Sequence, residues 1–335
     1  TTHYSIPLRL VGSVMCIRDS VDRDDGPSIQ TTAELDGAVA DAEVIFLTGP
    51  VHKQRTYSMV LADHLSDGQV LVIAPGRSLG ALETAWLLRI GGCTADVTIV
   101  EAQGLPFWYN EAGSVLTLTS AAPMAAATLP SGRSETLNAL KKYLPNLVVF
   151  DSVLASGFSD GSALVEVPTL MMGGPALHGG AIPIPMGGKL LEENQTFASL
   201  IGSSQKTIIA KLTDERHKVA KAFGVRHLPS ASEMISTYGG SLRGDHSRPI
   251  PSQKMSKSLL RCGVIGSLVP LQSAGQIANL KVPVTSAIIT LASSILGADV
   301  SAAGRRLEAI GIDSGDIDTA RRAMDAIATG EKYGR

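Results

Sequence analysis

The sequence has few cysteines: Cys16, Cys93 and Cys262 are the only three among 335 residues, and they lie far apart. They form neither a disulfide framework nor a metal-ligand spacing, which predicts a reducing compartment and no bound metal. The sequence also lacks an apolar run of about 18 residues and the features of a signal peptide. We therefore expect a cytoplasmic protein with no membrane partner.

Charge of either sign is also scarce, since charged residues make up 18% of the chain and the net charge is −2. This near neutrality gives no reason to propose nucleic acid as a partner. Hydrophobic residues at 44% supply ample material for a core, and the length predicts two domains. Small-molecule chemistry is the expectation that remains.

Residues 29–172 are expected to form a dinucleotide-binding-type α/β domain. Continuous apolar runs at 43–48, 70–74 and 96–100 are typical of buried parallel strands, and helix-like segments alternate with them. Such repeats predict a Rossmann-like, doubly wound parallel sheet with right-handed crossovers. Residues 151–167 are expected to supply its last strand and helix.

Residues 173–335 are expected to form an α-helical domain. Apolar residues recur there at helical spacing, as in 208–224, which ends in a C-capping glycine. Further helices are predicted at 268–279, 285–296 and 302–310. Residues 1–28 fit neither pattern, and part of them resembles a translated sequencing-adapter tract from a metagenome assembly. We expect this segment to be a non-native or disordered leader.

The loops that follow the first three predicted strands lie at the sheet edge where ligands bind in such folds. Glycine in these loops lets a ligand approach the backbone closely, although glycine and proline can also simply punctuate turns. The candidate cofactor-binding residues are Gly49, Pro50, Pro75 and Gly76.

One histidine, His178, lies in the glycine-rich stretch 171–181 between the two expected domains. An imidazole titrates near neutral pH, so it can donate or accept a proton there. The alternative is a histidine that only hydrogen-bonds a backbone carbonyl in a tight inter-domain loop.

Several stretches, taken in their order and spacing, resemble the octopine/nopaline (opine) dehydrogenase family. They are 40–50, 67–83, 214–225, 268–271 and 304–311. The resemblance implies a dinucleotide-binding domain and a helical domain of the 6-phosphogluconate dehydrogenase C-terminal type, with the substrate between them. It also implies NAD or NADP as cofactor. The implied reaction is reduction of the imine formed from an α-keto acid and the amine of an amino acid.

In the family's Asn-Pro-x-x-His motif the histidine is the catalytic acid/base, and the match places His178 there. The motif's asparagine is replaced by Gly174. Our alignment places Gly263 where relatives carry the aspartate that pairs with the histidine. Without that carboxylate the pKa of the imidazole would fall relative to those relatives, unless Asp160 or Asp245 substitutes in space.

Arginine residues are candidate clamps for substrate carboxylates, because a guanidinium binds a carboxylate bidentately. Each is also open to the plainer interpretation of a solvated surface residue. The candidates are Arg77, Arg133, Arg243 and Arg248. Glu101, with residues 103–107, is expected to line the same substrate cleft.

Relatives begin with a strand and a Gly-x-Gly-x-x-Gly/Ala turn that holds the pyrophosphate, and no such motif precedes residue 29. We therefore expect an N-terminally truncated chain. One alternative to an opine-type dehydrogenase is a related two-domain reductase of hydroxyacid or 6-phosphogluconate type. Another is a catalytically inactive fragment that acts only as a binding module. The oligomeric state is open, with a homodimer as one candidate.

Overall fold

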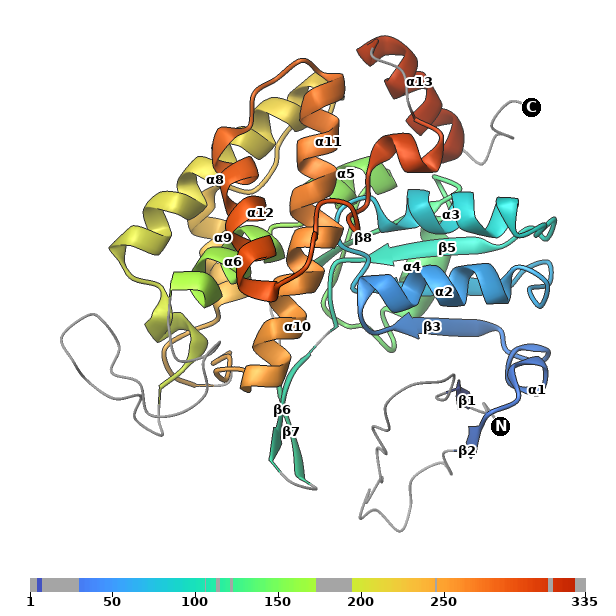
Figure 1. Ribbon diagram of the computed structural model, residues 1–335. Coiled ribbons are helices and arrows are strands. Elements are labelled where there is room, and N and C mark those ends of the chain that lie inside the picture. The colour runs from blue at the N-terminus through green and yellow to red at the C-terminus, as the bar shows by residue number, and fades with distance from the viewer. Residues whose placement is uncertain are drawn as a thin grey trace.

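The computed structural model describes residues 5–7, 30–105, 107–112, 115–120, 123–172, 195–244, 246–312 and 316–328. A five-stranded sheet with the order β3-β4-β5-β8-β9 lies at the centre of its first part (Figure 1). The strands span Val44–Thr48 (β3), Val70–Ala74 (β4), Thr98–Ala102 (β5), Met124–Leu129 (β8) and Leu147–Val149 (β9). The three predicted apolar runs are thus strands, and β3, β4 and β5 are mutually parallel.

The sheet is mixed, because β8 runs antiparallel to β5 and Ile99 lies opposite Leu129. A parallel return needs a crossover, usually a helix. The chain between β5 and β8 instead forms a hairpin of β6 (Phe107–Ala112) and β7 (Val115–Ser120), which projects away from the sheet (Figure 1). The apolar pattern of a buried strand does not record its direction, so the sequence predicted only parallel strands.

Helices cover both faces of this sheet, as a doubly wound fold requires. Alternate residues of β4 point to opposite faces. Leu71 and Ile73 share a core with α3 (Gly80–Ile90), whereas Val72 packs with α4 (Ser134–Leu140). Two more helices belong to this part, α1 (Leu35–Val39) and α2 (Val51–Leu61).

The prediction of a strand within 151–167 is wrong. The chain forms two helices there, α5 (Val153–Ser159) and α6 (Ser162–Met172). Ser152 starts the first of them, because its side chain accepts a hydrogen bond from the backbone N–H of Ala155. A serine N-cap before a short apolar segment is therefore the signal that indicates helix at this place.

The rest of the described chain is helical, as predicted. Its elements are η1 (Phe197–Leu200), α8 (Ser203–Ala222), α9 (Ala231–Gly239), α10 (Gln253–Gly263), a π-helical turn η2 (Val264–Leu268), α11 (Val269–Ile277), α12 (Pro283–Leu296), η3 (Leu307–Ile310) and α13 (Ile317–Ala328). Met324 and Ile327 of α13 join the same core as Leu88 of α3, so the last helix packs against the first part of the chain (Figure 1).

The predicted helix at 302–310 is wrong in its first half, since only η3 is helical. The chain packs tightly against α11 there, and a Cβ added at Gly304 would lie 2.4 Å from a methyl carbon of Val269. The backbone N–H of Arg305 bonds to the carbonyl of Ile265 instead of continuing a helix. Tertiary packing overrides helix propensity at this place.

Two further predictions remain open. The predicted domain boundary at 172/173 falls at the end of α6, where the described residues stop. Of the predicted leader only β1 (Ser5–Pro7) is described, and it pairs in parallel with β2 (Gln30–Thr32). Within the described part of the chain, no helix has both the length and the apolar character needed to cross a membrane.

Candidate functional site

A cavity of about 180 Å³ lies at the carboxyl end of the sheet. Its walls come from the segments after β4 and β5, the start of β6, helices α6, α9 and α10, and the segment before α10. Ligands in open α/β sheets bind beyond the carboxyl ends of the strands. This cavity is therefore the first candidate for a substrate site.

Three buried charged side chains form one wall of the cavity. The Glu166 carboxylate accepts hydrogen bonds from Nη2 of Arg248 at 2.8 Å and from Nη1 of Arg77 at 3.1 Å. Their side chains are only 4–7% exposed. Burial raises the pKa of Glu166, but the two guanidinium groups outweigh it and hold that pKa below its ordinary value. Among the described residues that line the cavity, these two cations face one anion, and Asp160 behind the wall also acts on Arg77.

Aromatic rings hold Arg248 in place. Its guanidinium carbon lies 4.2 Å from the ring centroid of Phe197 and 5.8 Å from that of Trp108. Nη1 also donates to the backbone carbonyl of Tyr238 at 2.6 Å. Cation–π contacts of this kind are strongest where water is excluded. Trp108 belongs to the projecting hairpin, which thus reaches the helical part of the molecule at the cavity.

Gln103 and Arg77 line the cavity, and each also has one fully buried polar atom without a hydrogen-bond partner among the described residues. The Gln103 amide nitrogen donates to the carbonyls of Arg77 and Ser156 and to Oε1 of Glu101, at 3.0–3.1 Å. Because three acceptors surround that nitrogen, the amide oxygen points elsewhere, and it has no hydrogen-bond partner among the described residues. The same holds for Nε of Arg77. Both side chains are buried, at 2% and 4% exposed.

Glu101 does not line the cavity but supports it from behind. Its carboxylate accepts from the backbone N–H of Ala81 at the start of α3 and from the Ser156 hydroxyl, both at 2.8 Å. A Cβ at Gly76 would lie 2.5 Å from Cγ of Glu101, so the glycine at 76 is required by this packing. Complete burial raises the pKa of Glu101 to about 7, although the two hydrogen bonds favour the charged form.

This raised pKa predicts a pH-dependent stability. The folded protein keeps the Glu101 proton up to about pH 7, whereas the unfolded chain releases it near its ordinary pKa of 4.5. The free energy of unfolding should therefore fall between these pH values, by roughly 3 kcal/mol at about 1.36 kcal/mol per pKa unit. Urea denaturation at pH 5 and pH 8 measures the difference.

Glu101→Gln should remove most of that pH dependence, because the variant has no proton to release. The matched control is Glu135→Gln, since Glu135 is an exposed glutamate on α4. The control should keep the full difference between the two pH values. An unchanged difference in the Glu101 variant would mean that other groups cause it.

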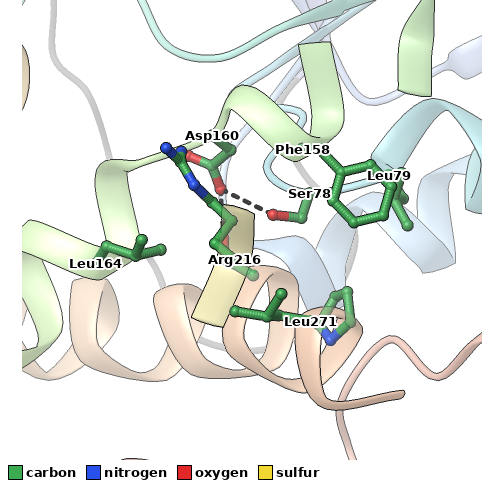
Figure 2. A pocket seen from close by; sticks show the side chains of 9 residues that line it. Ser78, Leu79, Phe158, Asp160, Leu164, Arg216 and Leu271 are labelled. Carbon is green, nitrogen blue, oxygen red and sulfur yellow. Dashed lines mark hydrogen bonds between the residues drawn. The ribbon is translucent and has the colours of Figure 1, made fainter. Parts of the chain in front are cut away.

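A second buried polar cluster surrounds Asp160, between α5 and α6. One carboxylate oxygen accepts from the hydroxyl of Ser78 at 3.4 Å (Figure 2) and from that of Ser267 at 2.5 Å. The other accepts from the backbone N–H of Ser162 at 3.1 Å and from its hydroxyl. Ser162 also bonds to Arg77. The cluster therefore connects the β4–α3 loop, the α5–α6 junction and the π-helical turn to the cavity wall.

Arg216 of α8 lines the small cavity of about 10 Å³ beside Asp160, a volume that suits one water molecule (Figure 2). Its guanidinium donates to the carbonyls of Ser159 and Pro229 at 3.1 and 2.7 Å. Burial lowers the pKa of Arg216 to about 10. The sequence analysis did not single out Arg216, because a charged residue in an amphipathic helix normally indicates a solvated face.

Gly263, where the sequence comparison predicted the family's aspartate, has no room for a carboxylate. A Cβ there would lie 2.9 Å from a methyl carbon of Val167 and 3.3 Å from Cβ of Ala163, because α10 and α6 pack closely. The sequence suggested Asp160 or Asp245 as the carboxylate that replaces this aspartate. Of these two, only Asp160 lies within the described residues. Asp245 and the candidate catalytic residue His178 lie outside the described residues.

The other arginine candidates lie away from the cavity. Arg133 pairs with Asp96 at 2.6 Å and with Thr98 at 2.7 Å, at the amino end of β5 and so at the opposite edge of the sheet. Arg243 is exposed in a turn and does not line the cavity. Of the four candidates, the structure brings only Arg77 and Arg248 together.

The loops after β3 and β4 have features that fit an approaching dinucleotide. Gly49 has a φ of +115°, and a Cβ added there would meet nothing within 4 Å, so the backbone borders open space. The Gln54 amide donates to the carbonyls of Gly49 and Pro75, at 3.1 and 2.9 Å, and so ties the two loops together. Pro75 also lines the cavity. The nicotinamide ring of a dinucleotide held by these loops would therefore lie next to the cavity.

In the described part of the chain, no three His, Cys, Asp or Glu side chains are grouped so that they could bind a metal ion. The chemistry of the cavity rests instead on guanidinium and amide groups. Such a set can bind a carboxylate and orient a polar substrate. A reaction there would need a proton donor and, for reduction, a cofactor.

The sheet with helices on both faces, followed by helices alone, has the architecture of a dinucleotide-binding domain joined to a helical domain, and comparisons with known proteins agree with it. No family model matches the chain. It is 27% identical over 295 residues to an opine dehydrogenase of Arthrobacter sp. (strain 1C), covering 84% of this chain and 78% of that protein. This similarity confirms the resemblance to the opine dehydrogenases that the sequence motifs predicted.

Solved structures agree on the fold. Octopine dehydrogenase, determined with NADH and L-arginine, has a TM-score of 0.58 at 17% identity and covers 90% of this chain and 81% of its own. D-mandelate dehydrogenase, determined with NADH and anilino(oxo)acetate, has a TM-score of 0.55 at 11% identity, with 80% of each chain covered. A Rossmann-like domain followed by a helical domain is thus the architecture of this chain.

Proposed function

We propose that this chain catalyses the NAD(P)H-dependent reductive condensation of an α-keto acid with the amine of an amino acid. The observation that carries the proposal is the cavity at the carboxyl end of the sheet, with Arg77 and Arg248 buried in its wall. Guanidinium groups suit substrates that carry carboxylates, and both proposed substrates do. The similarity to an opine dehydrogenase supports the same reaction class.

In the proposed reaction each group of the chain has a distinct task. A bound NADH or NADPH would supply the hydride, held by the loops that contain Gly49, Pro50, Pro75 and Gly76. Arg77 and Arg248 attract the substrate carboxylate, because together they exceed the charge of Glu166. His178 donates or accepts the proton at the substrate nitrogen, as the motif match implies. The apolar residues of the cavity, among them Phe107 and Leu259, reduce the amount of water near the imine.

The proton-transfer proposal is tested by His178→Gln. We expect turnover to fall by about 10²-fold or more, the usual contribution of a general acid or base. The measurement is keto-acid- and amino-acid-dependent oxidation of NADH or NADPH, followed by absorbance. His64→Gln is the matched control, since that histidine lies just after α2 and pairs with the exposed Asp36 of α1. Undiminished turnover in the His178 variant would refute the role.

A second candidate function is reduction of a keto acid to a hydroxyacid. The likeness to D-mandelate dehydrogenase favours it, because the two chains share the architecture. The discriminating observation is dependence on an amine. If a keto acid alone is reduced as fast as keto acid with amino acid, the chain is a hydroxyacid-type reductase.

The third candidate is a binding module without catalysis. Calorimetric titration with NADH and with NADPH separates it from both enzymes. Micromolar binding of either supports an enzyme and also shows which cofactor is preferred. The absence of binding to both supports the inactive fragment. The predicted homodimer and the cytoplasmic location remain predictions, and light scattering on the purified chain tests the first.

A further inference from the structure

We propose that Trp108 positions the guanidinium group of Arg248 for binding a substrate carboxylate, and thereby makes the β6–β7 hairpin part of the substrate site. The inference rests on the proposed function and adds a positioning residue to its site. Three observations support it: the place of Trp108 at the cavity, the way in which Arg248 is held, and the neutral charge of the indole ring.

Trp108 lies where the sheet and the helical part of the chain meet at the cavity. It is the second residue of β6, in the hairpin that projects from the sheet (Figure 1). Its ring centroid lies 5.8 Å from the guanidinium carbon of Arg248, and both residues line the cavity. Phe197, the other ring beside Arg248, is completely buried and is not among the described residues that line the cavity. Trp108 is therefore the ring that contacts this guanidinium at the cavity.

Hydrogen bonds alone do not fix the guanidinium of Arg248. Nη2 donates to Glu166 and Nη1 donates to the carbonyl of Tyr238, at 2.8 and 2.6 Å. Both bonds act at the edge of the planar group, whereas the face of the indole contacts the cation itself. A guanidinium has more N–H donors than these two bonds use, so it can still donate to a ligand carboxylate. The direction in which those donors point then depends on the ring of Trp108.

An indole ring orients a cation without removing its charge. Glu166 also orients Arg248, but its carboxylate offsets part of the positive charge that a substrate carboxylate would meet. The ring of Trp108 attracts the guanidinium through its quadrupole and carries no net charge. Among the aromatic side chains, tryptophan is the best partner in such contacts. Trp108 thus holds the arginine still and leaves its charge available to an anionic ligand.

The first experiment compares Trp108→Leu with Trp108→Phe. The KM for pyruvate, at saturating NADH and amino acid, should rise about tenfold in the leucine variant, because the carboxylate meets a less ordered guanidinium. It should rise less in the phenylalanine variant, which keeps a ring. The kcat of both should stay within about threefold of the parent chain, because Trp108 acts on the carboxylate clamp and not on the reacting nitrogen. An unchanged KM in the leucine variant would overturn the inference.

A control variant and a stability measurement separate positioning from a general structural role. Trp86→Phe is the matched control, since Trp86 lies on α3 beside Gly311 and does not line the cavity. It should leave KM and kcat unchanged. Trp108 belongs to none of the hydrophobic clusters that the described residues form, so Trp108→Leu should keep the urea midpoint of the parent chain. A lowered midpoint with a matching fall in kcat would show a structural role instead.

The second experiment observes the contact without turnover. The chain has two tryptophans, so Trp108 is the only one left in the Trp86→Phe variant. With NAD⁺ present, which cannot reduce a keto acid, titration with pyruvate should change the Trp108 emission saturably, because a bound carboxylate alters the charge beside the ring. Adding Arg248→Lys should weaken the apparent affinity at least about tenfold, since lysine lacks the planar fork of donors. Sodium chloride at equal ionic strength is the control for salt effects.

Failure of the inference and failure of the proposed function give different results. If no pair of keto acid and amino acid oxidises NADH or NADPH, the proposed function is wrong, and the emission titration then decides the inference by itself. A saturable response that weakens with Arg248→Lys supports the inference. The absence of a saturable response, or a response that Arg248→Lys leaves unchanged, overturns it. Normal turnover with an unchanged KM in Trp108→Leu overturns the inference and leaves the proposed function in place.

Discussion

Glu166→Gln is expected to lower the free energy of unfolding by about 3–5 kcal/mol, the usual cost of removing one partner from a buried ion pair. The glutamate is 5% exposed and stands between two arginines that are 4% and 6% exposed. Glutamine keeps the shape but removes the charge, so two buried guanidinium groups lose their anion. Urea denaturation of the variant and the parent chain, followed by tryptophan fluorescence, measures the loss.

A surface pair provides the matched control for Glu166. Glu308 lies 3.3 Å from Arg306, and both side chains are nearly half exposed. Glu308→Gln should cost less than about 1 kcal/mol, because solvent screens an exposed pair. Equal losses in the two glutamine variants would show that burial of the Glu166 cluster does not matter for stability.

The Glu166 contribution also has a defined pH range. The two arginines hold the pKa of Glu166 below its ordinary value of 4.5, despite the burial that raises it. The stabilisation is therefore complete above the unfolded-state pKa and is lost as the pH falls through the lower, folded-state pKa. The difference between Glu166→Gln and the parent chain should accordingly shrink in acid.

Arg305→Met is expected to lower the free energy of unfolding by a similar amount, about 3–5 kcal/mol. Arg305 is 1% exposed, and its Nε donates to Glu83 at 2.7 Å. Nη1 donates to the carbonyl of Ser78 at 2.6 Å and also reaches those of Gly76 and Gly266. Methionine fills part of the volume but removes the donor to Oε2 of Glu83 and to the Ser78 carbonyl, whereas the Gly266 carbonyl keeps its bond from the backbone N–H of Ser78.

The matched variants for Arg305 separate charge from geometry. Arg305→Lys keeps the charge but cannot supply a planar fork of donors, so its loss should lie between those of the parent chain and the methionine variant. Arg306→Met, next in the chain and 46% exposed at its side chain, should cost less than about 1 kcal/mol. A full recovery by lysine would mean that only the charge of Arg305 stabilises the fold.

Arg305 has a position that links stability to the site. Its acceptors Gly76 and Ser78 flank Arg77, the residue that lines the cavity. The segment between α12 and η3 therefore holds the β4–α3 loop from the helical side. The sequence placed residue 305 only within a stretch of family resemblance, because an arginine in a predicted helix carries no sign of burial.

Several candidate residues were predictable because their neighbours in the chain are informative. Arg77 comes directly after Gly76 and shortly after the end of a buried strand. This order predicts a position at the carboxyl edge of a parallel sheet. Glu101 was predicted to line the substrate cleft, but it is completely buried and is not among the residues that line the cavity. Glu166 was missed, although a single acid within the apolar run 163–170 is a usable sign of a buried, paired carboxylate.

Other roles could be assigned only from the folded chain. Arg77 and Arg133 were equal candidates in the sequence, yet one lines the cavity and the other pairs with Asp96 at the opposite edge of the sheet. Asp160 and Ser267 hydrogen-bond although they are 107 residues apart. Such contacts depend on how helices pack, and residue types alone do not specify that packing.

The sequence by itself determined the three parallel strands, most of the helices after residue 197 and the resemblance to opine dehydrogenases. These are recorded in hydrophobic periodicity and local motifs, which depend on residues close together in the chain. Only the tertiary structure decided the direction of β8, the pairing of Glu166 with two arginines and the unpaired atoms of Gln103 and Arg77. Those features arise from contacts between distant segments, where burial removes water and makes each partner essential.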